Sequence, residues 1–118
     1  MDKRLETDRN IWLSTTRPDG KPHLIPIWFV WVRDHVYICT QSKTVKVRNL
    51  SQNPRGSFAL EDGSHPLIGE SLATLLSAPY PADVIAAFKT KYDWDITIDP
   101  VYDVLIELTI TRWLEWQV

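Results

Sequence analysis

Two hydroxyl side chains and three cations lie close together between residues 40 and 50 of this chain. They are Thr40, Ser42, Lys43, Lys46 and Arg48. Ser42 is expected to cap a helix that begins near Lys43, and the free amides and positive dipole of a helix start favour a bound anion. The segment therefore predicts a phosphate site. An alternative stays open, in which this is a capped surface helix with a solvated basic face.

The basicity of this segment is local. The whole chain has 13 Lys and Arg against 15 Asp and Glu, a net charge of -2. Such a balance offers no broad electrostatic surface for nucleic acid or membrane, so we expect neither as a partner. Residues 1–10 are charged, and the longest apolar run, residues 24–32, is too short to span a bilayer. A cytoplasmic location is therefore expected.

Side chains suited to metal or nucleophilic chemistry are few and scattered. The chain has 3 histidines and 1 cysteine. Their spacing fits no metal motif, so no metal site is expected. Cys39 lies in an apolar segment and is interpreted as an inert buried thiol rather than a nucleophile. His23 is expected to be an exposed strand residue, and no side chain is assigned as catalytic.

The elements that must position these residues are mostly strands. With 118 residues and 44% hydrophobic content, a single domain over residues 1–118 is expected. Six strands are predicted, over residues 11–16, 22–32, 36–40, 56–61, 67–76 and 102–113, with a possible bulge at Gly69. Two short helices are predicted, one from Lys43 to Asn53 and one from Pro81 to Tyr92. This order predicts a mainly β (α+β) fold, an antiparallel split β-barrel of Greek-key type.

One predicted strand is unusual because residues 24–32 are apolar at every position. The alternation of a half-exposed strand is absent, so both faces must be covered. The core of the domain can cover one face. The other face needs a second layer.

Several stretches together resemble a known family. They are residues 15–31 (TTRPDGKPHLIPIWFVW), 46–50 (KVRNL), 53–55 (NPR), 60–63 (LEDG), 88–96 and 112–114. In this order they resemble the pyridoxamine 5'-phosphate oxidase-like, FMN-binding split β-barrel family of flavin and deazaflavin oxidoreductases. The resemblance extends over residues 11–116, and the ordered set is more specific than any one motif.

The resemblance implies a homodimer with a flavin, FMN, bound at the subunit interface. The partner and the flavin ring would cover the second face of residues 24–32. Ring contacts are expected from Pro26, Ile27, Trp28 and Phe29. Phosphate or ribityl contacts are expected from Thr40, Ser42, Lys43, Lys46 and Asn49, with Lys46 as the main cation. Arg48 is a weaker candidate, since it lies about 200° around the helix from Lys46.

The implied activity is that of an FMN-dependent oxidoreductase with a small-molecule redox substrate. Vitamin B6 oxidation is not expected, because true pyridoxamine phosphate oxidases have a further basic C-terminal segment. Glu70 departs from the family pattern and is given no role. Two alternatives stay open: an F420-dependent reductase whose acidic tail lies near Arg17, Lys21 and Arg55, and a non-enzymatic flavin carrier or sensor.

Overall fold

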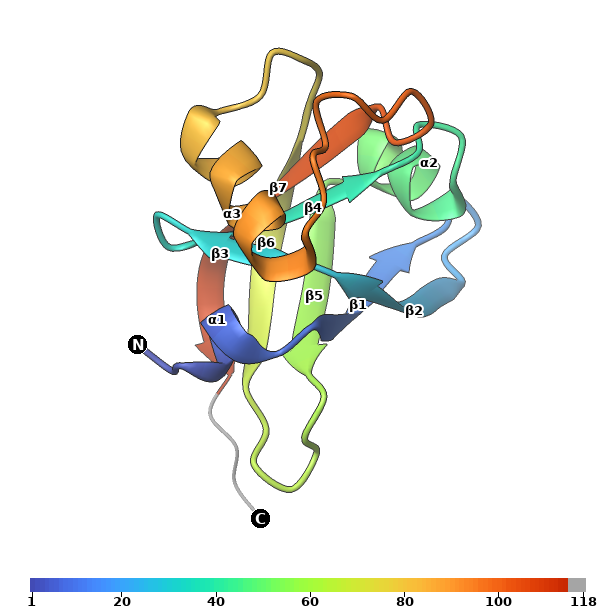
Figure 1. Cartoon of the computed structure of the whole chain (residues 1–118). Coiled ribbons are helices and arrows are strands. Elements are labelled where there is room, and N and C mark those ends of the chain that lie inside the picture. Colours follow the sequence, from blue (N-terminus) through green and yellow to red (C-terminus); the bar gives the residue numbers. More distant parts are fainter. Residues whose placement is uncertain (115–118) are drawn as a thin grey trace.

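Seven antiparallel strands and three short helices make up residues 1–114, the part of the chain that this computed structural model describes (Figure 1). The strands are β1 (Asn10–Thr16), β2 (Pro22–Trp28), β3 (Val30–Val32), β4 (His35–Thr40), β5 (Arg55–Leu60), β6 (Ile68–Leu76) and β7 (Val104–Leu114). The helices are α1 (Arg4–Thr7), α2 (Val45–Gln52) and α3 (Ala82–Tyr92). Trp116, which the family resemblance includes, lies outside the described residues.

The strand order explains how the sheet becomes a split barrel. It runs β2-β1-β5-β6-β7-β4-β3. β2 and β3 follow one another in the chain, yet β2 pairs with β1 at one edge and β3 pairs with β4 at the other edge. The chain therefore passes from one edge of the curved sheet to the other in the bent segment that contains β2 and β3. β2 and β4 come near each other at the bend, and within residues 1–114 they form no ladder, so this is where the barrel is split.

The predicted fold class is confirmed, but the strand count of six is wrong. The expected strand over residues 22–32 is two strands, because the ladder stops at Phe29. The Phe29 N–H donates to the Tyr92 hydroxyl oxygen, and the Phe29 carbonyl accepts from the Lys91 amine. Both backbone groups thus bind side chains of α3 instead of a neighbouring strand. The bulge expected at Gly69 lies one residue later, between Glu70 and Ser71.

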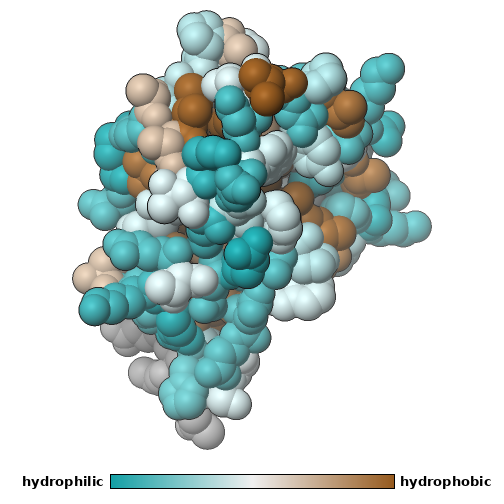
Figure 2. All heavy atoms as spheres, in the orientation of Figure 1, coloured by the Kyte–Doolittle hydropathy of each residue, from teal (hydrophilic) through white to brown (hydrophobic). Residues whose placement is uncertain are grey.

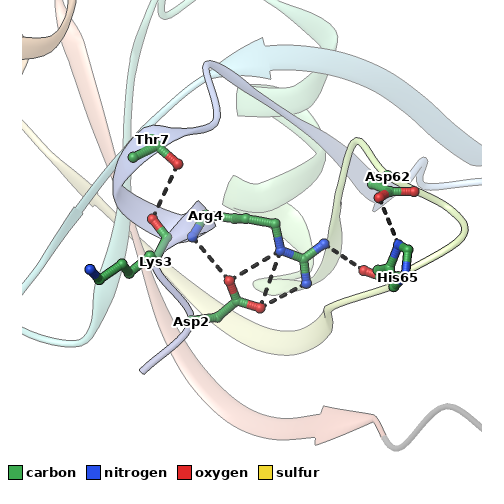
Figure 3. Close-up of polar contacts among 6 residues, drawn as sticks. All are labelled: Asp2, Lys3, Arg4, Thr7, Asp62 and His65. Atoms are coloured by element: carbon green, nitrogen blue, oxygen red, sulfur yellow. Dashed lines mark hydrogen bonds and ion pairs between the residues drawn. The ribbon is translucent and has the colours of Figure 1, made fainter.

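Helix α1 was not expected from the sequence, and its contacts explain its place. Arg4 forms an ion pair with Asp2 at 2.7 Å and donates to the backbone carbonyl of His65 in the β5–β6 loop (Figure 3). Leu5 of this helix is fully buried in the core. Tertiary contacts therefore stabilise a helix that is too short to form by itself.

The hydrophobic core consists of two clusters on opposite faces of the sheet. The first lies inside the barrel and includes Ile11, Leu13, Ile38, Phe58, Leu60, Ile106 and Leu108, with Val47 and Leu50 from α2. The second lies between α3 and the outer side of β3, β4 and β7 and includes Tyr37, Val84, Phe88 and Leu105. No helix in the described residues is long and apolar enough to cross a membrane.

The outer side of β1 and β2 belongs to neither cluster within residues 1–114. Trp12 pairs with Pro26 and Ser14 with Leu24 on this side of the ladder, and Asn10 pairs with Trp28. Leu24 is 61% exposed and Trp28 is 43% exposed. We call Trp12, Leu24, Pro26 and Trp28 the outer apolar face. The inward residues of β2, Ile25 and Ile27, pack on the core instead.

Candidate functional site

A pocket of about 590 Å³ lies where the barrel is split. Its lining comes from the end of β2, the start of β1, the end of β4 and the segment after α3, and consists of Asn10, Pro26, Ile27, Trp28, Cys39, Trp94, Asp99 and Tyr102. We call it the split pocket. Most of this lining is aromatic or aliphatic, which suits a flat apolar ligand. Three of the expected ring contacts, Pro26, Ile27 and Trp28, are brought together here.

Trp28 forms an aromatic wall of the split pocket. Its ring stacks on Tyr92, with centroids 4.4 Å apart and planes 10° from parallel. The edge of Trp94 meets it at 6.3 Å. The Arg9 guanidinium lies 5.3 Å from the centre of the Trp28 ring and 4.8 Å from that of Tyr92. Trp28 is thus held by neighbours while part of its surface stays accessible.

A second part of the lining comes from the loop between α3 and β7. Asp99 organises this loop by accepting hydrogen bonds from the Trp94 ring nitrogen at 3.2 Å and from the amides of Val101 and Tyr102. Cys39 contributes to the lining from β4. Burial, together with the carboxylates of Asp99 and Asp103, raises the pKa of Cys39 to about 12. The prediction that the thiol is buried is confirmed, and the raised pKa favours its neutral form.

Lys46 is the largely buried cation of the predicted phosphate segment. Only 8% of it is exposed, and burial lowers the pKa of its amine. Within residues 1–114 the amine has no ion-pair or hydrogen-bond partner. Such a site lacks the counter-charge that a buried cation requires. Its chemistry suits an anionic group.

Asn49 lies one helical turn after Lys46 and is also buried. Its amide donates to the Thr15 hydroxyl at 3.0 Å, which ties α2 to β1. This contact already uses one donor of the Asn49 side chain. Asn49 also lines a separate pocket of about 500 Å³, together with Arg17 and the exposed Arg48.

The expectation that Ser42 caps a helix from Lys43 is wrong. Helix α2 begins at Val45, its N-cap residue is Thr44, and no side chain caps it. The Ser42 amide and hydroxyl both donate to the Asp103 carboxylate, at 2.9 and 3.0 Å. These bonds lower the pKa of Asp103. Ser42 therefore holds the segment before α2 against the start of β7.

The remaining candidates have different surroundings. Thr40 is buried and directly follows Cys39, the last pocket residue of β4, whereas Lys43 is exposed. Phe29 is fully buried in the inner core, and its N–H and C=O are both bound by α3. Phe29 is therefore not brought to the pocket surface with Trp28.

His23 differs from its expected exposure. It is half-buried on the inward side of β2, opposite Thr15, and its Nδ1 atom is enclosed without a hydrogen-bond partner in the described residues. Burial, with the charges of Arg17 and Lys46, lowers the pKa of His23. A lowered pKa keeps the ring neutral beside two cations. The alternation of residues 22–28 in the β1–β2 ladder could have indicated this orientation.

Sequence reasoning missed five of the eight residues that line the pocket, including Cys39, which was interpreted only as a buried thiol. Trp94, Asp99 and Tyr102 belong to an irregular segment that has no periodic pattern, and Asn10 lies at the start of a strand. Their position depends on contacts made far away in the chain. No local signal in the sequence identifies them.

Comparison with known proteins gives a family and a set of similar folds. The sequence model of the family described as Pyridoxamine 5'-phosphate oxidase matches residues 1–117. No curated protein matches this chain. Among solved structures, one named F420 Reductase has a TM-score of 0.75 and 23% identity, and the match covers 95% of this chain and 94% of that one.

Two further structures share the fold. HutZ, named as a heme storage protein from Vibrio cholerae, has a TM-score of 0.78 and 20% identity, with 93% of this chain and 87% of that one covered. A pyridoxamine 5'-phosphate oxidase-related, FMN binding protein from Nostoc punctiforme has a TM-score of 0.62 and 18% identity, with 86% and 70% covered. At these identities the likeness concerns the fold, on which proteins with different ligands are built.

Proposed function

This chain belongs to the pyridoxamine 5'-phosphate oxidase family, and from that premise we propose that it is an FMN-binding oxidoreductase. The flavin ring packs in the split pocket against Trp28, and the phosphate binds at Lys46. The observation that carries the proposal is the largely buried Lys46, whose amine has no counter-charge within residues 1–114. A phosphate would supply that charge.

The split pocket fits the ring part of the cofactor. A planar tricyclic ring needs a flat, mostly apolar surface, and Trp28, Ile27 and Pro26 provide one. Cys39 lines the same pocket, and the chain continues from it through Thr40 towards α2. The proposal places one extended ligand along this course, with its ring in the split pocket and its phosphate at Lys46. When bound, FMN supplies the electron transfer, while this chain supplies orientation and charge.

We further propose that the working unit is a homodimer. The outer apolar face includes Leu24 and Trp28, which are 61% and 43% exposed. It adjoins the split pocket, because Pro26 and Trp28 belong to both. A second copy that covers this face would also exclude water from one side of the ring. The substrate would then be a small molecule that reaches the exposed part of the flavin.

F420 is the second candidate cofactor. A separate pocket of about 500 Å³ beside α2 contains two arginines, Arg17 and Arg48. A cofactor with acidic groups beyond its phosphate could place them there. Arg55, also expected near such a tail, lines a different pocket on the outer side of β5 and β6. A non-enzymatic flavin carrier is the third possibility.

The identity of the bound cofactor tests this proposal directly. The absorption spectrum and mass of the molecule that co-purifies should be those of FMN, and titration of the apoprotein should favour FMN over riboflavin and F420. An F420 spectrum supports the second candidate. A porphyrin, or no binding of any of these molecules, contradicts the proposal. Reduction and reoxidation of the bound cofactor with a coupled small-molecule acceptor then separates an enzyme from a carrier.

A further inference from the structure

Helix α3 ends in two residues that bind the backbone where β2 gives way to β3. The Phe29 N–H donates to the Tyr92 hydroxyl oxygen at 3.0 Å, and the Lys91 amine donates to the Phe29 carbonyl at 2.9 Å. The Tyr92 hydroxyl also lies 2.6 Å from the Arg9 carbonyl, to which it can donate. Inside a sheet, a neighbouring strand supplies such partners. Here two side chains of one helix take its place.

The Lys91 amine is held among aromatic rings. It lies 3.9 Å from the centre of the Phe29 ring and 5.5 Å from that of Tyr92. Burial lowers the pKa of Lys91 to about 8, against a raising effect of the Asp8 carboxylate, and the Arg9 guanidinium lowers it further. Within residues 1–114 the amine has no ion-pair partner. A desolvated cation of this kind is costly, and an apolar side chain would support the helix at lower cost.

These contacts act on the wall of the split pocket. Trp28 directly precedes Phe29, and its ring stacks on Tyr92 with centroids 4.4 Å apart. Tyr92 therefore touches Trp28 through its ring and fixes the next residue through its hydroxyl. Lys91 binds the carbonyl of the same residue, and the Tyr92 hydroxyl lies 2.7 Å from that carbonyl as well.

We propose that Lys91 and Tyr92 are positioning residues for the planar ligand of the split pocket. By holding the backbone of Phe29, they set the angle at which the Trp28 ring meets that ligand. Neither side chain lines the pocket, so their effect on the ligand is transmitted through Trp28. The inference rests on the proposed function, in which that ligand is a flavin ring.

The test compares the affinity of riboflavin and FMN for variants of the whole chain. Lys91→Met removes one of the two donors within reach of the Phe29 carbonyl, and Tyr92→Phe removes the other, the hydroxyl, but keeps the stacked ring. Each should weaken riboflavin roughly two- to tenfold, the loss that one ordinary hydrogen bond accounts for. FMN should weaken by the same factor, because Lys46 is untouched. Lys91→Arg, which keeps a charged donor, should restore the wild-type affinity.

Lys89→Met is the matched control, because Lys89 lies on the same helix but is exposed and pairs with Asp93 at 2.6 Å. It should leave both affinities unchanged. The near-ultraviolet circular dichroism of the Trp28–Tyr92 pair should change in Lys91→Met, which keeps both rings, but not in the control. If Lys91→Met does not fold, the flavin affinities of Tyr92→Phe decide whether the inference holds.

The outcomes separate this inference from the proposed function. If the wild type binds neither flavin, the proposed function fails and the inference fails with it. If the wild type binds riboflavin and the folded variants bind it equally well, only the inference is overturned. A lower affinity for FMN with an unchanged affinity for riboflavin overturns the inference as well. That pattern would show that the substitution acts on the binding of the phosphate and not on the ring.

Discussion

Lys46 and Arg48 lie two positions apart on α2, yet Lys46 is buried and Arg48 is exposed. This difference could be predicted from the sequence, because helical geometry points the two side chains about 200° apart. The role of Ser42 could not. Its hydroxyl was expected to cap a helix, but the Asp103 carboxylate accepts both of its donors from a position 61 residues later. A long-range partner of full charge outcompetes a local cap, and residue spacing does not show it.

Replacing Lys46 with alanine should weaken FMN binding about 10- to 150-fold, the loss of a charge-assisted contact worth roughly 1.5–3 kcal/mol. Riboflavin, which lacks the phosphate, should bind the variant as it binds the wild type. Calorimetric titration of the apoprotein measures both. Arg48→Ala is the control on the same helix and should reduce the affinity for FMN far less. Equal losses for FMN and riboflavin would show that Lys46 supports the fold rather than the phosphate.

Lys91 should make the stability of the protein depend on pH above about 8. Its pKa is lowered from 10.5 to about 8 in the folded chain. Between these values the unfolded chain holds a proton that the folded chain has released, so stability rises with pH. Because Lys91 is partly accessible, the rise should total about 1–3 kcal/mol rather than the full linkage value.

Urea unfolding at pH 7.5, 8.5 and 9.5 measures this effect as the difference between the wild type and Lys91→Met. The difference is needed because Cys39, Tyr37 and Tyr92 have pKa values raised to about 12 and act in the opposite direction at higher pH. The rise should be absent from the variant. Parallel pH profiles for the two proteins would contradict the lowered pKa.

At the scale of elements, most strands and both longer helices could be predicted from periodicity and turn residues. The break at Phe29 could not, since residues 24–32 are apolar throughout and carry no turn signal. The partners that end the ladder, Lys91 and Tyr92, come from α3, more than sixty residues later. Helix α1 was missed for a similar reason, because a four-residue helix depends on contacts such as the buried Leu5.

The packing of β6 against β5 gives a prediction at this scale. A Cβ at Gly69 would lie 2.7 Å from two ring carbons of Phe58 and 3.3 Å from Trp113. Phe58 is buried, so its ring has little room to move, and Gly69→Ala should destabilise the protein by about 1–3 kcal/mol. Urea unfolding measures the change. Gly63→Ala is the control, because nothing lies within 4 Å of its added methyl group; an equal loss there would refute the packing argument.

At the scale of the whole molecule, the outer apolar face relates the fold to the proposed dimer. The sequence indicated that residues 24–32 need cover on both faces. The inner face of these residues is covered, because Ile25 and Ile27 pack on the core. On the outer side, Leu24, Pro26 and Trp28 remain exposed within residues 1–114. Figure 2 shows hydrophobic residues at several separate places on a mostly hydrophilic surface. The outer apolar face adjoins the split pocket, since Pro26 and Trp28 belong to both.

Sedimentation should therefore give a mass twice that of the 13.7 kDa chain at low micromolar concentration. Leu24→Asp should shift the protein towards monomer, because it places an unpaired charge in an apolar interface. The same variant should also weaken flavin binding if the partner shields the ring. Ile98→Asp is the control, since Ile98 is 76% exposed on the loop before β7. A wild type that stays monomeric at tens of micromolar, or an equal effect of the two variants, would rule out this face as the dimer interface.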